Sequence, residues 1–395
     1  MAKRSITELA LNGRRVFIRV DFNVPISDGS ISDDSRIRAA LPTIRYAIER
    51  GASPIIASHL GRPRGVRNPE LSLEPIATHL GQLLKHPVTF ARTCTGAEAK
   101  QAIESTSPHG ITVLENVRFN EGEETNNPDF SAALAELADC YVNDAFGAAH
   151  RAHASTTGIV EHMTDAAAGL LLARELEYLG SLLTKPTRPF VAVLGGSKVS
   201  GKLEVINNLL PRVDTLLIGG AMAYTFLRGR HLPTGKSLVE DALVDTAANL
   251  EQEAFAKGVN LVLPTDHLVT TTIQPDASST LMDVDDERIA NKIGVDIGPQ
   301  TQTHFSETIR TAETVIWNGP MGVFEIDAFS KGTIAIAKAV AQSKGTTVIG
   351  GGDSVAAIQK AAVTEKISHV STGGGASLEF LGGRILPGVA ALPDC

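Results

Sequence analysis

Residues 191–203 read Val-Ala-Val-Leu-Gly-Gly-Ser-Lys-Val-Ser-Gly-Lys-Leu, an apolar run that enters a glycine turn. A helical pattern follows the turn, so this stretch predicts a strand–turn–helix unit of an α/β protein. Gly196, Gly201 and Lys202 have the spacing of a phosphate-binding P-loop. A P-loop continues with a Ser or Thr whose hydroxyl binds magnesium, whereas this chain has Leu203. The turn therefore indicates phosphate binding, and the metal ligand must lie elsewhere.

Short β-rich segments alternate with helical patterns along the whole chain. The predicted strands are Val16–Val20, Pro54–Ser58, Thr112–Glu115, Asp139–Asn143, Phe190–Leu194, Thr215–Gly219, Asn260–Pro264, Thr314–Asn318, Thr346–Gly350 and Ser368–Ser371. The predicted helices include Ser35–Arg50, Ser131–Ala138, Lys202–Leu210, Leu238–Lys257 and Lys331–Ser343. Such alternation is typical of parallel sheets covered by helices on both faces.

At 395 residues the chain exceeds the usual size of a single core, so we expect two domains. Apolar residues recur at helical spacing over Gly169–Lys185, and Pro186 and Pro189 close this segment. We therefore predict an α/β protein of two Rossmann-like lobes, each a parallel β-sheet flanked by helices, joined by an interdomain helix and hinge. The boundaries are placed at 1–170, 171–186 for the interdomain helix, and 187–381.

Composition excludes several classes of function. The net charge of −8 disfavours nucleic acid and anionic lipid as partners. No segment has the length and apolarity of a membrane span or a signal peptide, and the three cysteines form no closely spaced pair, so we expect a cytoplasmic protein. Arginine is concentrated in the N-terminal half, where 15 of 22 precede position 175; this count fits an anionic ligand there and simple drift in Arg/Lys usage equally well.

Glycine-rich turns follow two predicted strands of the C-terminal half, at Gly350–Ser354 and Ser371–Ser377. Each precedes a helical pattern, so backbone N–H groups there can bind an anion. Asp353 is the carboxylate that could hold the missing magnesium, and Ser354 could cap the helix. The segment Trp317–Glu325 combines an apolar wall with a terminal carboxylate, suited to a purine and its ribose. Ile293–Pro299 reads as a generic turn.

Arginine and histidine side chains follow the strands of the N-terminal half. They occur in the segments Arg19–Pro25, Asp33–Arg38, Ser58–Arg64, Glu115–Phe119 and Asn143–His153. Because parallel strands end at one edge of a sheet, these groups are expected to form a basic pocket for an acidic phosphorylated metabolite. His150 and His153 could instead be metal ligands, but no further ligand completes a zinc set.

Three other functions remain as alternatives at this stage. A P-loop-like NTPase would need the hydroxyl that Leu203 lacks. A dinucleotide dehydrogenase would need an early Gly-x-Gly-x-x-Gly, and the first strand ends in Asp-Phe-Asn instead. A non-catalytic sugar-phosphate-binding protein would not need two lysines, Lys198 and Lys202, in the turn after residue 194 (the lysine turn).

Several segments, taken together and in order, resemble phosphoglycerate kinases over essentially the whole chain. They are Val20–Pro25, Arg36–Ile44, Ser58–Pro63, Glu115–Phe119, Asp144–Ser155, the lysine turn, Trp317–Glu325, Gly350–Ser354 and Ser371–Glu379. The resemblance implies reversible, direct in-line phosphoryl transfer between ATP and the carboxylate of 3-phosphoglycerate, giving 1,3-bisphosphoglycerate and ADP, in glycolysis or carbon fixation. It implies a monomer, magnesium bound with the nucleotide, and a C-terminal segment of about 382–395 that packs on the N-terminal lobe.

The resemblance also implies roles for individual residues. It places the phosphoglycerate in the N-terminal domain, near Asp21, Asn23, Arg36, His59, Arg62, Arg118 and Arg151. It places the nucleotide in the C-terminal domain, near Lys202, Gly294, Asn318, Glu325, Gly351, Gly352, Asp353 and Ser354, with Asp353 as the metal ligand. The residues that it implies for the transfer itself are Arg36, Lys198, Gly352 and Gly374.

The chain departs from the family pattern at three positions near these residues. Ser197 stands where the family usually has Ala, Gly201 where it usually has Asp, and Ala148 where Thr is common. The absence of a carboxylate at Gly201 is expected to change how Lys202 or the metal is held.

Overall fold

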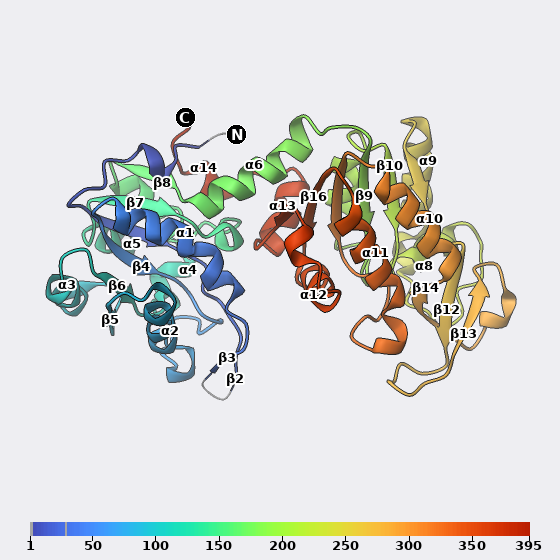
Figure 1. The fold of residues 1–395 in the computed structure, drawn as a ribbon, viewed down its shortest axis with the longest axis horizontal. Coiled ribbons are helices and arrows are strands. Elements are labelled where there is room, and N and C mark those ends of the chain that lie inside the picture. The colour runs from blue at the N-terminus through green and yellow to red at the C-terminus, as the bar shows by residue number, and fades with distance from the viewer. Residues whose placement is uncertain (1–2, 28–29) are drawn as a thin grey trace. The chain divides into compact units, whose positions relative to one another are not determined.

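The computed structural model describes residues 3–27 and 30–395. The chain divides into two compact units, residues 3–177 with 385–395, and residues 178–384. The division falls inside α6 (Leu170–Thr184), within the segment predicted as an interdomain helix. Figure 1 shows that each unit contains a sheet with helices packed on both sides, so the predicted fold class is confirmed.

The N-terminal unit is built on a six-stranded parallel sheet in the order β5-β6-β4-β1-β7-β8. Its strands are β1 (Arg15–Arg19), β4 (Ser53–Ala57), β5 (Val88–Ala91), β6 (Ile111–Leu114), β7 (Cys140–Asn143) and β8 (Ala166–Ala168), with a hairpin of β2 (Ile26–Ser27) and β3 (Ser30–Ile31). Besides α6, its helices are α1 (Ser35–Glu49), α2 (Glu74–Leu84), α3 (Gly96–Ser105), α4 (Glu121–Glu124), α5 (Pro128–Ala135) and α14 (Pro387–Ala390).

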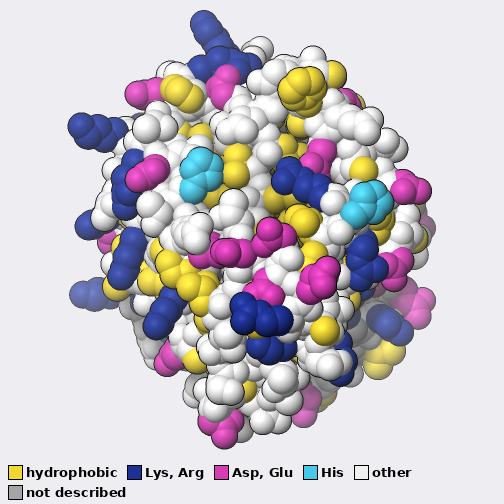
Figure 2. Space-filling view, turned by 90° about the vertical axis from the view of Figure 1, so that its right-hand side faces the viewer, with side chains coloured by type: hydrophobic (Ala, Val, Ile, Leu, Met, Phe, Trp, Pro, Cys, Tyr) yellow, Lys and Arg dark blue, Asp and Glu magenta, His cyan; other side chains and the backbone are white. Residues whose placement is uncertain are grey.

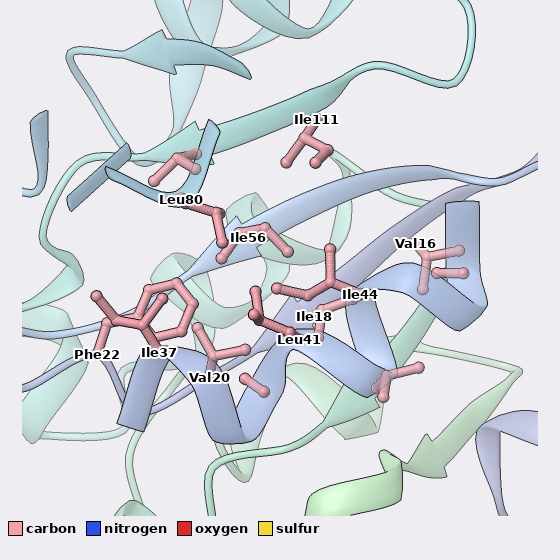
Figure 3. Packing of buried hydrophobic residues seen from close by; sticks show 14 of the residues in the cluster. Val16, Ile18, Val20, Phe22, Ile37, Leu41, Ile44, Ile56, Leu80 and Ile111 are labelled. Carbon is pink, nitrogen blue, oxygen red and sulfur yellow. The ribbon is translucent and has the colours of Figure 1, made fainter. Parts of the chain in front are cut away.

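The core of this unit lies between α1 and the central strands. Ile37, Leu41 and Ile44 recur at helical spacing on α1 and are buried. Figure 3 shows them beside Ile18 of β1 and Ile56 of β4. Burying each such side chain contributes about 1.5–3 kcal/mol. Because both faces of the sheet are covered, successive residues of β1 and β4 are buried instead of alternating between buried and exposed.

The C-terminal unit contains a second six-stranded parallel sheet in the order β11-β10-β9-β15-β16-β17. Its strands are β9 (Phe190–Leu194), β10 (Thr215–Ile218), β11 (Asn260–Val262), β15 (Thr314–Asn318), β16 (Thr346–Gly350) and β17 (His369–Val370). The helices are α7 (Leu203–Leu209), α8 (Ala223–Gly229), α9 (Val244–Ala256), α10 (Pro299–Arg310), α11 (Lys331–Gln342), α12 (Gly352–Lys360) and α13 (Gly375–Leu381).

An additional antiparallel sheet in this unit was not predicted. It consists of β13 (Ser279–Asp283), β12 (Asp266–Thr270) and β14 (Ile293–Ile297), in that order. The prediction of a turn at Ile293–Pro299 was therefore wrong, because main-chain pairing with β12 holds most of this segment extended. The helix predicted at Leu238–Lys257 begins only at Val244, after a short 3₁₀ turn.

The surface shown in Figure 2 carries Lys and Arg side chains interspersed with Asp and Glu. Interspersed charges give no extended basic surface on this face, as the net charge of −8 suggests. Among the described residues, none of the helices combines the length and the apolar character needed to span a bilayer.

Candidate active site

A ligand-binding edge in the N-terminal unit is expected where β1 lies between β4 and β7. The chain leaves β1 toward β4 on one side and later forms β7 on the other, so β1–β7 is a topological switch point. In open α/β sheets, ligands bind at the carboxyl ends of the strands near such a point. The loops that follow these strands carry most of the predicted anion-binding residues.

Arg36 is oriented by the loop after β1. Its Nη1 donates to Asp21 Oδ2 at 2.9 Å and to the Asn23 carbonyl at 3.3 Å. Asn23 Oδ1 in turn accepts a hydrogen bond from Gly61 N at 2.9 Å. The Arg36 side chain remains one-third exposed, whereas Asp21 is 10% exposed. Asp21 and the Asn23 carbonyl thus hold the guanidinium on one side. Because the side chain is one-third exposed, its remaining N–H groups are open to an anion.

His59 lies near Asp21, the residue that orients Arg36, and is almost fully buried. Its Nδ1 is 3.2 Å from Arg19 Nη2 and 4.0 Å from Asp21 Oδ1. Burial lowers the pKa of His59 well below its ordinary value, and the neighbouring arginine charges lower it further. His59 is therefore neutral at physiological pH.

The three remaining predicted residues lie at the same edge but differ in exposure. Arg118 is buried, donates to the Gly61 carbonyl at 2.7 Å and lies 3.3 Å from Glu124 Oε1. Burial lowers the pKa of Arg118 to about 10. Arg151 is half-buried, with its Nε donating to His150 Nε2 at 3.1 Å. Arg62 is exposed.

The nucleotide-side residues meet at the equivalent switch point of the second sheet, between β9 and β15. Gly195 N donates to the Asn318 carbonyl at 3.0 Å, and Gly196 N donates to the Pro320 carbonyl at 2.9 Å. A Cβ on Gly195 would lie 2.2 Å from the Pro320 oxygen, so a side chain there would push the two loops apart. The glycine turn is therefore required by this close approach of two loops.

Lys202 and Lys198 differ in their surroundings. Lys202 is at the N-cap of α7, and its Nζ donates to Asn318 Oδ1. Burial lowers the pKa of Lys202 to about 8, against a smaller opposing effect of Asp353. Lys198 is exposed. Because α7 begins only at Leu203, Lys198 precedes the helix and the two lysines do not share a helical face.

The turn after β16 leads directly into α12. Gly351 is the N-cap, with φ of +89°, a conformation that favours glycine. Asp353 is exposed in the first helical turn. Ser354 does not cap the helix as predicted: it is fully buried inside α12, and its Oγ accepts a hydrogen bond from Gly319 N at 2.6 Å. Its side chain therefore holds the β15 loop.

The turn after β17 has a similar form, with Gly374 at the N-cap of α13 and φ of +53°. A Cβ placed on Gly352 or Gly374 would meet no heavy atom within 4 Å among the described residues. The space in front of both helices is therefore open to a ligand.

A cavity of about 320 Å³ lies beside the glycine turn. Its wall includes Tyr224, His267, Gly294, Val323 and Glu325, and Asp353 lies at its border. Trp317 does not line it: the indole is fully buried and its Nε1 donates to the Gly319 carbonyl. The apolar wall predicted from Trp317–Glu325 is thus made by the later residues of that segment.

Gly294 is required by this wall. A Cβ on it would lie 1.6 Å from Tyr224 Oη. Tyr224 Oη is also 2.9 Å from His267 Nδ1, and burial lowers the pKa of His267 to about 4. The cavity therefore has an uncharged aromatic wall, suitable for a planar heterocycle.

A family model described as phosphoglycerate kinase matches residues 6–384. The chain belongs to the phosphoglycerate kinase family. It is 56% identical over 397 residues to a phosphoglycerate kinase of Solibacter usitatus, covering 99% of this chain and all of the relative. It is 53% identical over 398 residues to that of Chlorobium phaeobacteroides, with both chains fully covered.

Solved structures of the phosphoglycerate kinase family are also similar. The structure from Coxiella burnetii has a TM-score of 0.90 and 44% identity, with 98% of each chain covered. The structure from Pyrococcus horikoshii has a TM-score of 0.86 and 33% identity, again over 98% of each chain. These matches support ATP:3-phosphoglycerate phosphotransferase activity and disfavour the P-loop-like NTPase and the non-catalytic binding protein.

Magnesium-nucleotide chemistry, general in phosphoglycerate kinases, fits the donors present. The described residues contain no cluster of three His, Cys, Asp or Glu side chains able to hold a metal alone. Magnesium is commonly bound by one or two carboxylates together with substrate phosphates. Asp353 is exposed beside the cavity, and within the described part of the chain its carboxylate makes no hydrogen bond. It is therefore available as such a ligand.

Several residues of both sites were missed by sequence reasoning. Tyr224 and His267 line the cavity but carry no motif, because they come from separate elements 43 residues apart. Glu123 and Ser155 are fully buried, and Ser155 accepts a hydrogen bond from Arg19 of β1. One signal was available: Arg19 is a charge inside the apolar run of β1, which requires a buried partner.

Proposed function

We propose that this chain transfers a phosphoryl group reversibly between ATP and the C1 carboxylate of 3-phosphoglycerate, with the acceptor in the N-terminal unit and the nucleotide in the C-terminal unit. The observation that carries the proposal is the partly buried Lys202 ammonium, which donates to Asn318 at the β9–β15 switch point. A partly buried ammonium with an amide partner and no carboxylate partner favours an anionic ligand. The nucleotide phosphates supply that charge.

The acceptor has two anionic groups, a phosphate and a carboxylate, and the proposed site supplies several cations for them. Arg36, Arg62 and Arg151 have exposed or half-buried guanidinium groups, which suit bidentate recognition of both anions. Asp21 and Asn23 orient Arg36. Arg118 and His59 are more deeply placed, and neutral His59 contributes an N–H donor without adding charge.

The nucleotide is proposed to place its base in the cavity beside Gly294 and its ribose near Glu325, whose carboxylate can accept from hydroxyl groups. The phosphates would then extend toward Lys202, Asn318 and the start of α12. The backbone N–H groups of Gly352 and Asp353 belong to the first turn of α12 and have no acceptor within the helix, so they would bind phosphate as at other anion-binding helix starts. Ser354 contributes indirectly by holding Gly319.

The transfer requires no general base, because a carboxylate acceptor is already ionised at neutral pH. The protein must instead hold two anions together and stabilise the charge that develops in the transition state. We assign this role to Arg36, Lys198 and the backbone N–H groups near Gly352 and Gly374. Magnesium, held by Asp353 and the phosphates, would neutralise phosphate charge. Lys198 is exposed, so its side chain can reorient with the phosphoryl group during transfer.

A coupled assay tests the proposal directly. The full chain, ATP and 3-phosphoglycerate are combined with a dehydrogenase that reduces 1,3-bisphosphoglycerate, and NADH oxidation is followed. Turnover that requires both substrates supports the proposal. Binding of both substrates without turnover would favour a non-catalytic binding protein instead. From the family we also infer a cytoplasmic monomer, which sedimentation of the purified chain and fractionation of cells can check.

A further inference from the structure

We propose that Glu123 is a positioning residue for acceptor binding, which acts through Ser155 and Arg19 to fix the hydrogen-bonding state of His59. The proposal rests on the proposed function, because it assumes that His59 faces the acceptor. Glu123 lies in α4 and is fully buried. Burying a carboxylate costs folding free energy unless the carboxylate is well hydrogen-bonded, so a fully buried Glu123 requires partners.

Glu123 holds the segment that ends in Ser155. Its Oε2 accepts from Ser155 N at 2.9 Å and its Oε1 accepts from Ser155 Oγ at 2.7 Å, while its carbonyl accepts from Ala154 N at 3.0 Å. Buried Tyr141 donates from Oη to the Ser155 carbonyl at 2.9 Å. Ser155 is therefore fixed on both its main chain and its side chain.

Ser155 connects this carboxylate to Arg19. A hydroxyl has one hydrogen, and since Ser155 Oγ donates it to Glu123, the oxygen lone pairs face Arg19. Arg19 Nε donates to that oxygen at 2.7 Å, and Arg19 Nη2 lies 4.0 Å from Glu123 Oε1. The guanidinium is fully buried. Glu123 thus supplies the opposite charge that a buried Arg19 requires.

Arg19 then determines which nitrogen of His59 carries the proton. Arginine can only donate, so His59 Nδ1, 3.2 Å from Arg19 Nη2, must be the acceptor. The proton of the neutral ring is therefore on Nε2. Among the residues that the structure describes, none forms a hydrogen bond with this Nε2. It is left as a donor for an anionic ligand.

The other charged groups around Glu123 do not replace this arrangement. His153 Nδ1 is 3.8 Å from Glu123 Oε1, beyond hydrogen-bond distance, and burial lowers the pKa of His153 to about 3. Arg118 pairs with Glu124. Loss of the Glu123 charge would therefore leave Arg19 without a carboxylate partner. The guanidinium would still donate from Nη1 to the Val20 carbonyl, but its Nε and Nη2 side, which faces Ser155 and His59, would be less firmly fixed.

The test compares Glu123→Gln with Glu136→Gln in the full chain. Glu136 is an exposed partner of Lys100 in the same unit, so its replacement makes the same chemical change without burial. Nitrogen NMR of ¹⁵N-histidine-labelled protein, assigned with His59→Gln, reports which ring nitrogen is protonated. Calorimetry gives the dissociation constants for 3-phosphoglycerate and for ADP.

We expect wild type and Glu136→Gln to show His59 protonated on Nε2 alone between about pH 6 and pH 8. In Glu123→Gln that pattern is replaced by a mixture of tautomers. The dissociation constant for 3-phosphoglycerate rises about tenfold, the effect of one hydrogen bond to a charged group, while that for ADP is unchanged.

A wild-type tautomer and wild-type affinity in Glu123→Gln would overturn the proposal, as would equal loss of both affinities. If Glu123→Gln fails to fold, Ser155→Ala decides, because it removes the connecting hydroxyl and keeps both charges; it must show the same change at His59. Wild-type protein that binds no 3-phosphoglycerate would refute the proposed function. The NMR result tests the connection from Glu123 through Ser155 and Arg19 to His59 independently of ligand binding.

Discussion

The Lys202 ammonium donates a hydrogen bond to Asn318 Oδ1 and so connects the start of α7 to the end of β15. Asn318 Nδ2, the other end of the amide, is buried and has no hydrogen-bond partner within the described residues. It lies next to Gly351, where a Cβ would be 3.0 Å away. The amide thus accepts from the lysine at one end and leaves a donor, free among the described residues, beside the start of α12 at the other, where the phosphates are proposed to bind.

We predict that Asn318→Ala weakens ADP binding by about ten- to thirtyfold, because Lys202 loses its partner and the phosphates lose a donor. Calorimetric titration with ADP measures this. Asn207→Ala, on the exposed side of α7, serves as the control and should bind ADP normally. Equal affinity in the two variants would remove Asn318 from the site.

Nucleotide affinity should decrease as the pH rises through about 8. The pKa of Lys202 is lowered from 10.5 to about 8 by burial, so the ammonium is present below that pH and lost above it. Between about pH 7 and pH 9 the dissociation constant for ADP should rise up to about tenfold. Lys202→Arg keeps its charge over this range, so its profile should be flat. A flat wild-type profile would contradict the assignment.

Gly294→Ala should block the cavity, since its Cβ would overlap Tyr224 Oη at 1.6 Å. ADP binding should fall by at least about tenfold, with 3-phosphoglycerate binding unchanged, because a clash of this size forces Tyr224 or β14 to move. Gly180→Ala in α6 is the matched control, as a Cβ there meets no heavy atom within 4 Å in the described chain. Unchanged ADP affinity in Gly294→Ala would place the base elsewhere.

Arg36→Ala should reduce kcat by about a hundredfold or more while leaving the dissociation constant for ADP unchanged, because Arg36 is assigned to the transferring group. Steady-state kinetics and ADP titration separate the two effects. Arg38→Ala, two residues along α1 and paired with Asp34 on the surface, should be nearly normal. Equal losses of turnover and nucleotide binding in Arg36→Ala would contradict this role.

Ile44→Ala should lower the free energy of unfolding of the N-terminal unit by about 2–5 kcal/mol, since it leaves a cavity between α1 and the sheet. Arg45→Ala, exposed on the same helix, should change it by less than about 0.5 kcal/mol. Denaturant unfolding followed by circular dichroism compares the two. Similar stability of both variants would mean that this part of the core tolerates the cavity.

The parallel sheets could be predicted because strands such as β9 and β15 are buried on both faces and therefore contain runs of consecutive apolar residues. The antiparallel sheet could not be predicted in this way. Its edge strand β13 is mostly exposed, and β14 contains Gly294, so neither shows a clear apolar period. In the site, polar residues at strand ends were visible as local motifs. Contacts between distant segments, such as Arg19 with Ser155 or Tyr224 with His267, were not.

The strand–helix alternation of the two parallel sheets, the glycine turns and the family are properties of the sequence alone, because they depend on neighbouring residues and on local spacing. The partner of each buried charge was decided only by the tertiary structure. Lys202 meets Asn318 because β9 and β15 are adjacent in the sheet, although 116 positions separate the two residues. Arg19 is tied to Glu123 through Ser155 because folding excludes water from all three, and each polar group must then bond to whichever group the packing brings near.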